Sequence, residues 1–191
     1  KCVDESRANL GGIEPDTVMV HRPEDATGPY GREILANLQQ MKAMGRIRHV
    51  GVSLYDQKEI EACDGLGDVD CIQLPVNVVD QRLIRTGFLK SLSDMGIRLI
   101  ARSAFLQGLL LADEVSIPNG LDGLANAVGT IRYEAAKAGV TPLLLCLGFL
   151  KSRPEIDAVV VGANSLPELS GIFDAWREDV PTFPWSEFSL T

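Results

Sequence analysis

Residues 17–21 read Thr-Val-Met-Val-His, a short run of apolar and β-branched side chains that ends in a polar one. Four later segments repeat this pattern of a compact apolar run bounded by polar or turn residues. The five segments lie at 17–20, 49–52, 71–74, 98–101 and 158–161. Strands that are apolar throughout are typical of a parallel sheet covered on both faces. The pattern therefore predicts a parallel β-sheet of about five strands.

Helical periodicity fills the spaces between these predicted strands. Apolar side chains recur with helical spacing in residues 34–41, 83–95, 121–131 and 169–176. Thr141-Pro142 offers an N-cap and a first-turn proline for a helix through Leu150, and Gly96 is placed to end the 83–95 helix in a left-handed cap. Alternating strands and helices indicate right-handed βαβ units, so the fold class is α/β. A doubly wound sheet and a (β/α)8 TIM-type barrel both fit, and the barrel needs about three strands beyond the five found here.

Composition narrows the functional classes. The chain has 191 residues, is 46% hydrophobic and carries a net charge of −8, which suits one globular domain and argues against a nucleic-acid partner. No apolar run approaches the roughly 20 residues that a membrane span needs, so we expect no membrane partner. The four cysteines form no C-x-x-C pair, so we expect no metal site and a reducing, cytoplasmic location.

Polar or glycine residues lie at the carboxyl ends of all five predicted strands. Gln73 lies on the third strand, and the others directly follow their strands: His21, Ser53, Arg102-Ser103 and the run Gly162-Ala163-Asn164-Ser165. In both candidate architectures, functional residues lie at the carboxyl ends of the strands. The sequence therefore predicts a single site at this rim.

Each of these residues also has a structural interpretation. His21 could donate a hydrogen bond to a reacting carbonyl oxygen, or cap its strand by bonding to the backbone. Gln73, an amide in an apolar strand, needs a partner, which could be a carboxamide ligand or a neighbouring loop. Ser53 could form a turn or cap a helix. Asn164 or Ser165 could cap the next helix, whose N-terminus is suited to anions, while Gly108 could let the backbone approach a pyrophosphate.

Six strings now resemble one family, the aldo-keto reductases, and they occur in the family's order. Residues 16–25 (DTVMVHRPED) resemble the segment that ends in the family's catalytic histidine, and residues 45–53 (GRIRHVGVS) its "GKIRxIGVSN" stretch. Residues 70–77 (DCIQLPVN) resemble "xxxQxxYN", and residues 101–110 (ARSAFLQGLL) resemble "AYSPLAQGLL". Residues 140–142 and 161–165 are similar to its last helix pair and final phosphate loop.

The resemblance implies that residues 1–191 are part of an aldo-keto reductase barrel, without its N-terminal strands, that binds NADP(H) or NAD(H). It assigns His21 to catalysis, and Ser53 and Gln73 to the nicotinamide carboxamide. Arg102 stands where many members place an aromatic ring against the nicotinamide, and a guanidinium can also stack. The remaining assignments fall into two groups: Ser103, Phe105 and Gly108 lie along the pyrophosphate, and Gly162, Asn164, Ser165 and Glu168 face the adenosine.

Departures from the family pattern are equally specific. The family's catalytic tyrosine, lysine and aspartate come from strands that precede the segment of His21, and no residue here matches their motifs. Leu54 replaces the asparagine that usually follows Ser53. No arginine follows Ser165 to pair a 2′-phosphate, and Ile172 replaces the usual asparagine, so the choice between NADP and NAD stays open.

These observations predict an NAD(P)H-dependent reductase of a small-molecule aldehyde or ketone in the intact parent, with this chain alone inactive. The alternative is a catalytically silent subunit that binds the cofactor and serves in interaction or sensing. A third interpretation is an unrelated α/β barrel with a similar rim. Open sheet edges would also favour self-association.

Overall fold

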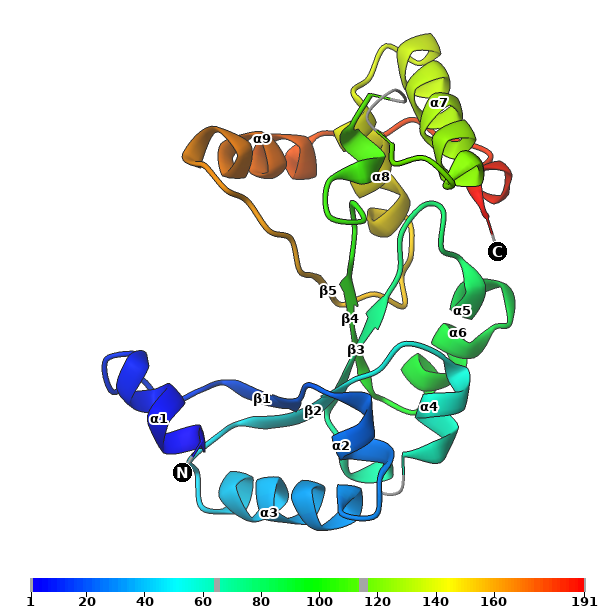
Figure 1. Ribbon diagram of the computed structural model, residues 1–191. Helices are drawn as coiled ribbons and strands as arrows, with labels where there is room; N and C mark the ends of the chain where they lie inside the picture. The colour runs from blue at the N-terminus through cyan, green and yellow to red at the C-terminus, as the bar shows by residue number, and fades with distance from the viewer. Residues whose placement is uncertain (1, 64–65, 114–116, 191) are drawn as a thin grey trace. The chain divides into compact units, whose positions relative to one another are not determined.

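The computed structural model describes residues 2–63, 66–113 and 117–190 (Figure 1). Its strands form one sheet in the order β1-β2-β3-β4-β5, and β1, β2 and β3 pair in parallel. The strands are β1 (Thr17–Val20), β2 (His49–Ser53), β3 (Cys71–Pro75), β4 (Arg98–Arg102) and β5 (Ala158–Val159). This arrangement confirms the α/β prediction of a parallel sheet interleaved with helices.

The chain divides into two compact units by its internal packing. The first comprises Lys1–Leu74 and Phe88–Ile100, and the second comprises Pro75–Gly87 and Ala101–Thr191.

In the first unit, helices pack around β1, β2 and β3. They are α1 (Cys2–Asn9), α2 (Pro23–Thr27), α3 (Gly31–Ala43), α4 (Gln57–Ala62) and α6 (Phe88–Asp94), with a 3₁₀ turn at Leu66–Asp68. Figure 1 shows α3 running alongside β1 and β2. Asp70 helps join the helix to the sheet, because its carboxylate accepts hydrogen bonds from Lys42 Nζ of α3 (2.6 Å) and from the Val50 N–H of β2 (2.8 Å).

The tight pairing of β2 with its neighbours requires a glycine at position 51. A Cβ atom there would lie 2.6 Å from Cys71 Sγ and 3.0 Å from Met19 Cγ. The resulting register pairs Gly51 with Cys71 and Ser53 with Gln73. Gly51 therefore contributes to aligning the polar residues at the ends of β2 and β3.

The second unit is built around helix α8 (Pro142–Lys151), whose residues from Leu144 to Leu150 are all buried. Thr141 caps α8 as predicted, since its Oγ1 accepts a hydrogen bond from the Leu144 N–H at 3.1 Å. The other elements of the unit are α5 (Arg82–Arg85), α7 (Asp122–Lys137), α9 (Leu166–Arg177) and the 3₁₀ turns Leu109–Leu111 and Trp185–Phe188. The C-terminal turn packs edge-on against α8, with the rings of Phe149 and Trp185 5.6 Å apart.

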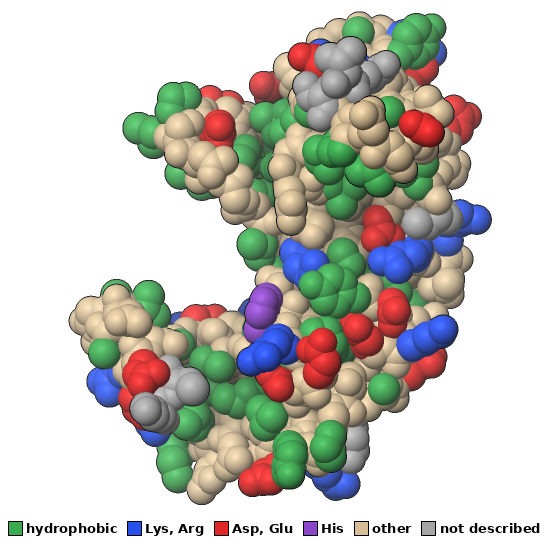
Figure 2. All heavy atoms as spheres, viewed as in Figure 1, with side chains coloured by type: hydrophobic (Ala, Val, Ile, Leu, Met, Phe, Trp, Pro, Cys, Tyr) green, Lys and Arg blue, Asp and Glu red, His purple; other side chains and the backbone are tan. Residues whose placement is uncertain are grey.

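Helix α9 exposes much of its apolar surface. Leu166 is 75% exposed and Phe173 is 55% exposed, and Figure 2 shows hydrophobic side chains (green) over this helix. The helix was predicted from residues 169–176, and the structure confirms it with an earlier start.

Two expected elements differ from the prediction. Residues 83–95 form two helices instead of one, because α5 ends before Thr86 and Gly87 adopts a left-handed φ of +73°. Gly96 does end α6 with a left-handed φ of +79°, as predicted. The last strand is shorter than residues 158–161, although the Val160 N–H still donates to the Ala101 carbonyl at 2.8 Å.

Across the ranges that the structure describes, no single helix is both long and apolar enough to cross a membrane. Helices α7 and α8 meet that test only when taken together, and they bend by 95° at their junction.

Candidate functional site

The ends of β2 and β3 bring two of the predicted site residues together in the first unit. Ser53 Oγ donates a hydrogen bond to Gln73 Oε1 over 3.2 Å, and Ser53 is only 2% exposed. The hydroxyl fixes the orientation of the amide, because the amide oxygen is the atom that it holds. Gln73 therefore finds a side-chain partner on the neighbouring strand, which neither of its two sequence interpretations included.

His21 directly follows β1, as predicted, and its side chain is exposed. Its neighbour Arg22 forms a salt bridge with Asp25 at 3.5 Å across the start of α2. The imidazole is therefore accessible at the carboxyl end of a parallel strand, the position at which α/β proteins present reactive groups.

In the second unit, a strained loop follows β4. Ser103, Leu106 and Gln107 all have positive φ values, of 59°, 44° and 58°, and Gly108 has a φ of 91°. Non-glycine residues in this region cost of order 1 to 3 kcal/mol each, and such strain is concentrated at ligand sites. The conformation of this loop is therefore specified by the surrounding structure.

Asn77 provides part of that support. Its side chain is fully buried, its Nδ2 donates to the Ser103 carbonyl at 3.1 Å, and its Oδ1 accepts from the N–H groups of Val79 and Asp80 at 3.0 and 2.9 Å. Sequence reasoning did not select Asn77 for the site. An amide directly after an apolar strand and before a polar turn was the signal that could have identified it.

The strained loop, the segment after β5 and α9 together enclose a cavity of about 610 Å³. Six of the predicted cofactor residues line it: Ser103, Phe105, Gly108, Gly162, Asn164 and Glu168. These residues come from segments separated by about fifty positions in the chain, so the fold brings them together. The lining also includes residues that sequence reasoning did not select, namely Ala104, Gln107, Leu111, Leu143, Val160, Val161, Gly171 and Ile172.

Two of the predicted cofactor residues, Arg102 and Ser165, do not line this cavity. Arg102 is not part of the lining, and its Nη1 donates to Ser103 Oγ at 3.3 Å. Ser165 is also absent from the lining and instead caps α9, where its Oγ accepts from the Glu168 N–H at 3.3 Å. The Glu168 carboxylate in turn accepts from the Asn164 N–H at 2.7 Å, one residue before the N-cap Ser165.

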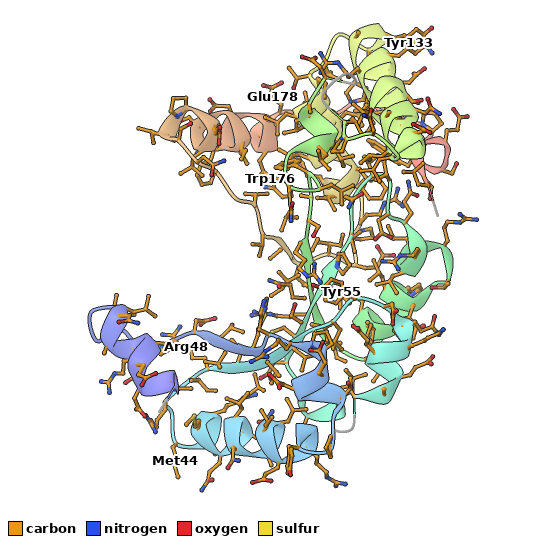
Figure 3. The ribbon with its side chains drawn as sticks, viewed as in Figure 1. Met44, Arg48, Tyr55, Tyr133, Trp176 and Glu178 are labelled. Atoms are coloured by element: carbon orange, nitrogen blue, oxygen red, sulfur yellow. The ribbon has the colours of Figure 1, made fainter. Side chains whose placement is uncertain are left out.

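The chemistry of these residues suits an extended ligand with polar groups. A left-handed glycine exposes its backbone for close approach, and short polar side chains surround an otherwise apolar lining. In the described parts of the chain, no three His, Cys, Asp or Glu side chains gather in a way that could hold a metal ion. Among the tyrosines, Tyr55 and Tyr133 are 50% and 67% exposed, and neither lines this cavity (Figure 3).

Comparison with known proteins identifies the family of this chain. The model of the aldo/keto reductase family matches residues 1–187. The chain therefore belongs to the aldo-keto reductase family, whose members generally use NAD(P)H. No curated protein matches the sequence.

Solved structures with the same fold are also aldo-keto reductases. Thermostable aldo-keto reductase Tm1743, in complex with the inhibitor epalrestat, has a TM-score of 0.72 and 19% identity. The apo form of AKR11C1 from Bacillus halodurans has a TM-score of 0.77 at 18% identity, and its holo form has 0.76 at 19%. The matches cover 97–98% of this chain but only 63–65% of those chains, and at such identities they show the fold alone.

Proposed function

We propose that the intact protein reduces a small-molecule aldehyde or ketone with NADPH or NADH. The observation that carries this proposal is the cavity in the second unit, because six residues assigned to the cofactor by motif all line it. Family membership over residues 1–187 supports the same reaction class. The bound nicotinamide would supply the hydride, and the protein would supply binding, orientation and electrostatics.

The motifs assign different residues to different parts of the cofactor. Ser53 and Gln73 would bond to the nicotinamide carboxamide, since Gln73 retains an amino group that can donate to it. Ser103, Phe105 and Gly108 would lie along the pyrophosphate. Position 108 of the strained loop is a glycine, so no side chain there keeps the backbone away from the ligand. Gly162, Asn164, Ser165 and Glu168 would face the adenosine.

His21 would act on the substrate. Its exposed imidazole would donate a hydrogen bond from a ring nitrogen to the carbonyl oxygen, which stabilises the negative charge that develops there. The proton itself would come from a tyrosine that the family supplies from a strand preceding this segment. We therefore propose that the polypeptide of residues 1–191 binds the dinucleotide without turning over a carbonyl substrate.

Two measurements on the 191-residue polypeptide test these statements. Fluorescence titration with NADPH and NADH should give saturable binding, whereas a steady-state assay with a generic aldehyde should give no oxidation of either. An absence of binding would favour an unrelated α/β protein over a reductase. Clear oxidation would refute the proposed inactivity of this chain.

The competing function is a silent subunit that binds the cofactor without chemistry. The coding sequence upstream of Lys1 separates the two functions. A tyrosine and a lysine at the ends of preceding strands favour the enzyme, and substitutions at both favour the subunit. We further propose a cytoplasmic location, which is supported by the buried free thiols of Cys71 and Cys146.

A further inference from the structure

The cavity in the second unit has an uneven distribution of charge. Among the described residues that line it, Glu168 is the single side chain with a formal charge, and the others are apolar, glycine or neutral polar residues. The cavity therefore offers one carboxylate and no lysine or arginine to a ligand. Such a lining is unfavourable for a ligand that brings an additional dianionic group.

The hydrogen bonds at the start of α9 strengthen this effect. A helix N-terminus normally presents free N–H groups that can hold a phosphate. Here the Glu168 carboxylate accepts from the Asn164 N–H at 2.7 Å, and the Glu168 N–H donates to Ser165 Oγ at 3.3 Å. Pro167, in the first turn, has no N–H to offer. The Glu168 carboxylate is therefore held beside the N-terminus of α9, where its charge disfavours a ligand phosphate.

We propose that Glu168 is a specificity-determining residue that makes this protein prefer NAD(H) over NADP(H). The proposal rests on the proposed function, which assigns the start of α9 to the adenosine end of the cofactor. NADP(H) differs from NAD(H) only by a phosphate on the 2′ oxygen of that ribose. A carboxylate can accept hydrogen bonds from ribose hydroxyl groups, as acidic residues do in other dinucleotide sites, but it repels a 2′-phosphate.

The hydrogen bond that holds the Glu168 carboxylate in place should make it discriminate between NADH and NADPH more strongly than a mobile surface carboxylate would. The bond to Asn164 holds one oxygen of Glu168 at the rim of the cavity, so the side chain can turn away only by breaking this hydrogen bond. The repulsion of a nearby phosphate should therefore persist in the bound state. We expect NADH to bind about tenfold more tightly than NADPH, which is the effect of one like charge at a partly exposed site.

The test compares dissociation constants for NADH and NADPH by fluorescence titration of the 191-residue polypeptide. Calorimetric titration with ADP-ribose and with its 2′-phosphorylated form compares the affinities for the adenosine end of the cofactor alone. Glu168→Gln keeps an oxygen that can accept from the Asn164 N–H but removes the charge, so the NADH:NADPH preference should shrink to about twofold or less. Glu168→Lys should reverse it. The wild-type preference should also narrow as salt is raised, because ions screen the repulsion.

Asp174→Asn is the matched control, because it removes one negative charge from the same helix outside the cavity lining. This variant should keep the wild-type preference. Binding of both dinucleotides with equal or tighter affinity for NADPH in the wild type overturns the role of Glu168 and leaves the proposed function standing. If neither NADH nor NADPH binds, both the role of Glu168 and the proposed function are overturned. The affinities of the wild-type protein for NADH and NADPH test the proposal even if a variant does not fold.

Discussion

Ser53 and Gln73 lie opposite each other on neighbouring parallel strands, and their side chains are joined by a 3.2 Å hydrogen bond from Ser53 Oγ to Gln73 Oε1. Removing the hydroxyl by Ser53→Ala leaves the amide without its fixed orientation. One hydrogen bond contributes about 0.5 to 1.5 kcal/mol, so NAD(P)H should bind about 2- to 12-fold more weakly. Fluorescence titration measures this change. Ser152→Ala, which removes a hydroxyl bonded to the Phe149 carbonyl, should leave the affinity unchanged. Equal effects of the two substitutions would contradict a role for Ser53 in binding.

Asp70 should make stability depend on acidity. Burial raises the pKa of its carboxyl, but the hydrogen bonds from Lys42 and the Val50 N–H, together with the Lys42 charge, outweigh burial and hold the pKa below the ordinary 3.8. A lowered pKa in the folded state adds stability that is present above pH 3.8 and is lost as pH falls through the folded-state value. At neutral pH, Asp70→Asn should lower the free energy of unfolding by on the order of 1 kcal/mol, and this difference should shrink toward pH 2.

Urea unfolding at several pH values measures the effect of Asp70→Asn. The exposed Lys90–Asp94 pair offers a control, because Asp94→Asn should change the free energy of unfolding by a few tenths of a kcal/mol at neutral pH. If the loss caused by Asp70→Asn stayed constant from pH 7 to pH 2, the carboxylate charge would have no part in it.

Lys151 holds the C-terminal end of α9. Its Nζ donates to the Trp176 carbonyl at 2.9 Å and to the Glu178 carbonyl at 2.7 Å, and it lies 5.8 Å from the centre of the Trp176 ring (Figure 3). Lys151→Met keeps most of the side-chain length but leaves both carbonyls without this donor. The free energy of unfolding should therefore fall by about 1 to 3 kcal/mol. Lys137→Met is the matched control, since Lys137 lies 6.0 Å from the Tyr133 ring but bonds to the Glu134 side chain and not to backbone carbonyls. A comparable loss in both variants would argue against the carbonyl bonds.

Replacing Gly148 and Gly123 by alanine should change the free energy of unfolding in opposite directions. A Cβ at Gly148 would lie 2.3 Å from Val180 Cγ1, so Gly148→Ala should destabilise the protein by about 1 to 3 kcal/mol. A Cβ at Gly123 meets nothing within 4 Å, and alanine favours a helix more than glycine, so Gly123→Ala should stabilise by up to about 1 kcal/mol. Calorimetric melting of both variants measures these changes, and a stabilised Gly148→Ala protein would show that Val180 moves freely.

The sequence was sufficient for the parts of the fold that depend on local chemistry. Apolar β-branched runs specified the five strands, and Thr141-Pro142 and Ser165 marked two helix starts that the structure contains. The break between α5 and α6 was missed because Leu83, Leu89 and Leu92 keep a helical spacing across Gly87, and all three are buried. Periodicity reports burial, and a glycine can interrupt a helix without disturbing that pattern.

The candidate site was predictable in its residue types but less so in its contacts. Chain order placed Ser53 and Gln73 at the ends of strands, yet only the register shows that they face each other. Likewise, Ser165 and Glu168 have the spacing of a capping box, but the sequence alone does not show that the Glu168 carboxylate also lines a cavity. Leu143 and Gly171 line the same cavity and carry no chemical signal in the sequence.

The double role of Glu168 has an evolutionary consequence. A glutamate codon becomes a lysine codon by a single nucleotide change, so one mutation could invert the charge at this cavity. The same mutation would remove the carboxylate that completes the start of α9. A lineage that changed its preferred coenzyme through this residue would therefore lose folding stability at the same moment, and would need a compensating substitution near Asn164 to retain both.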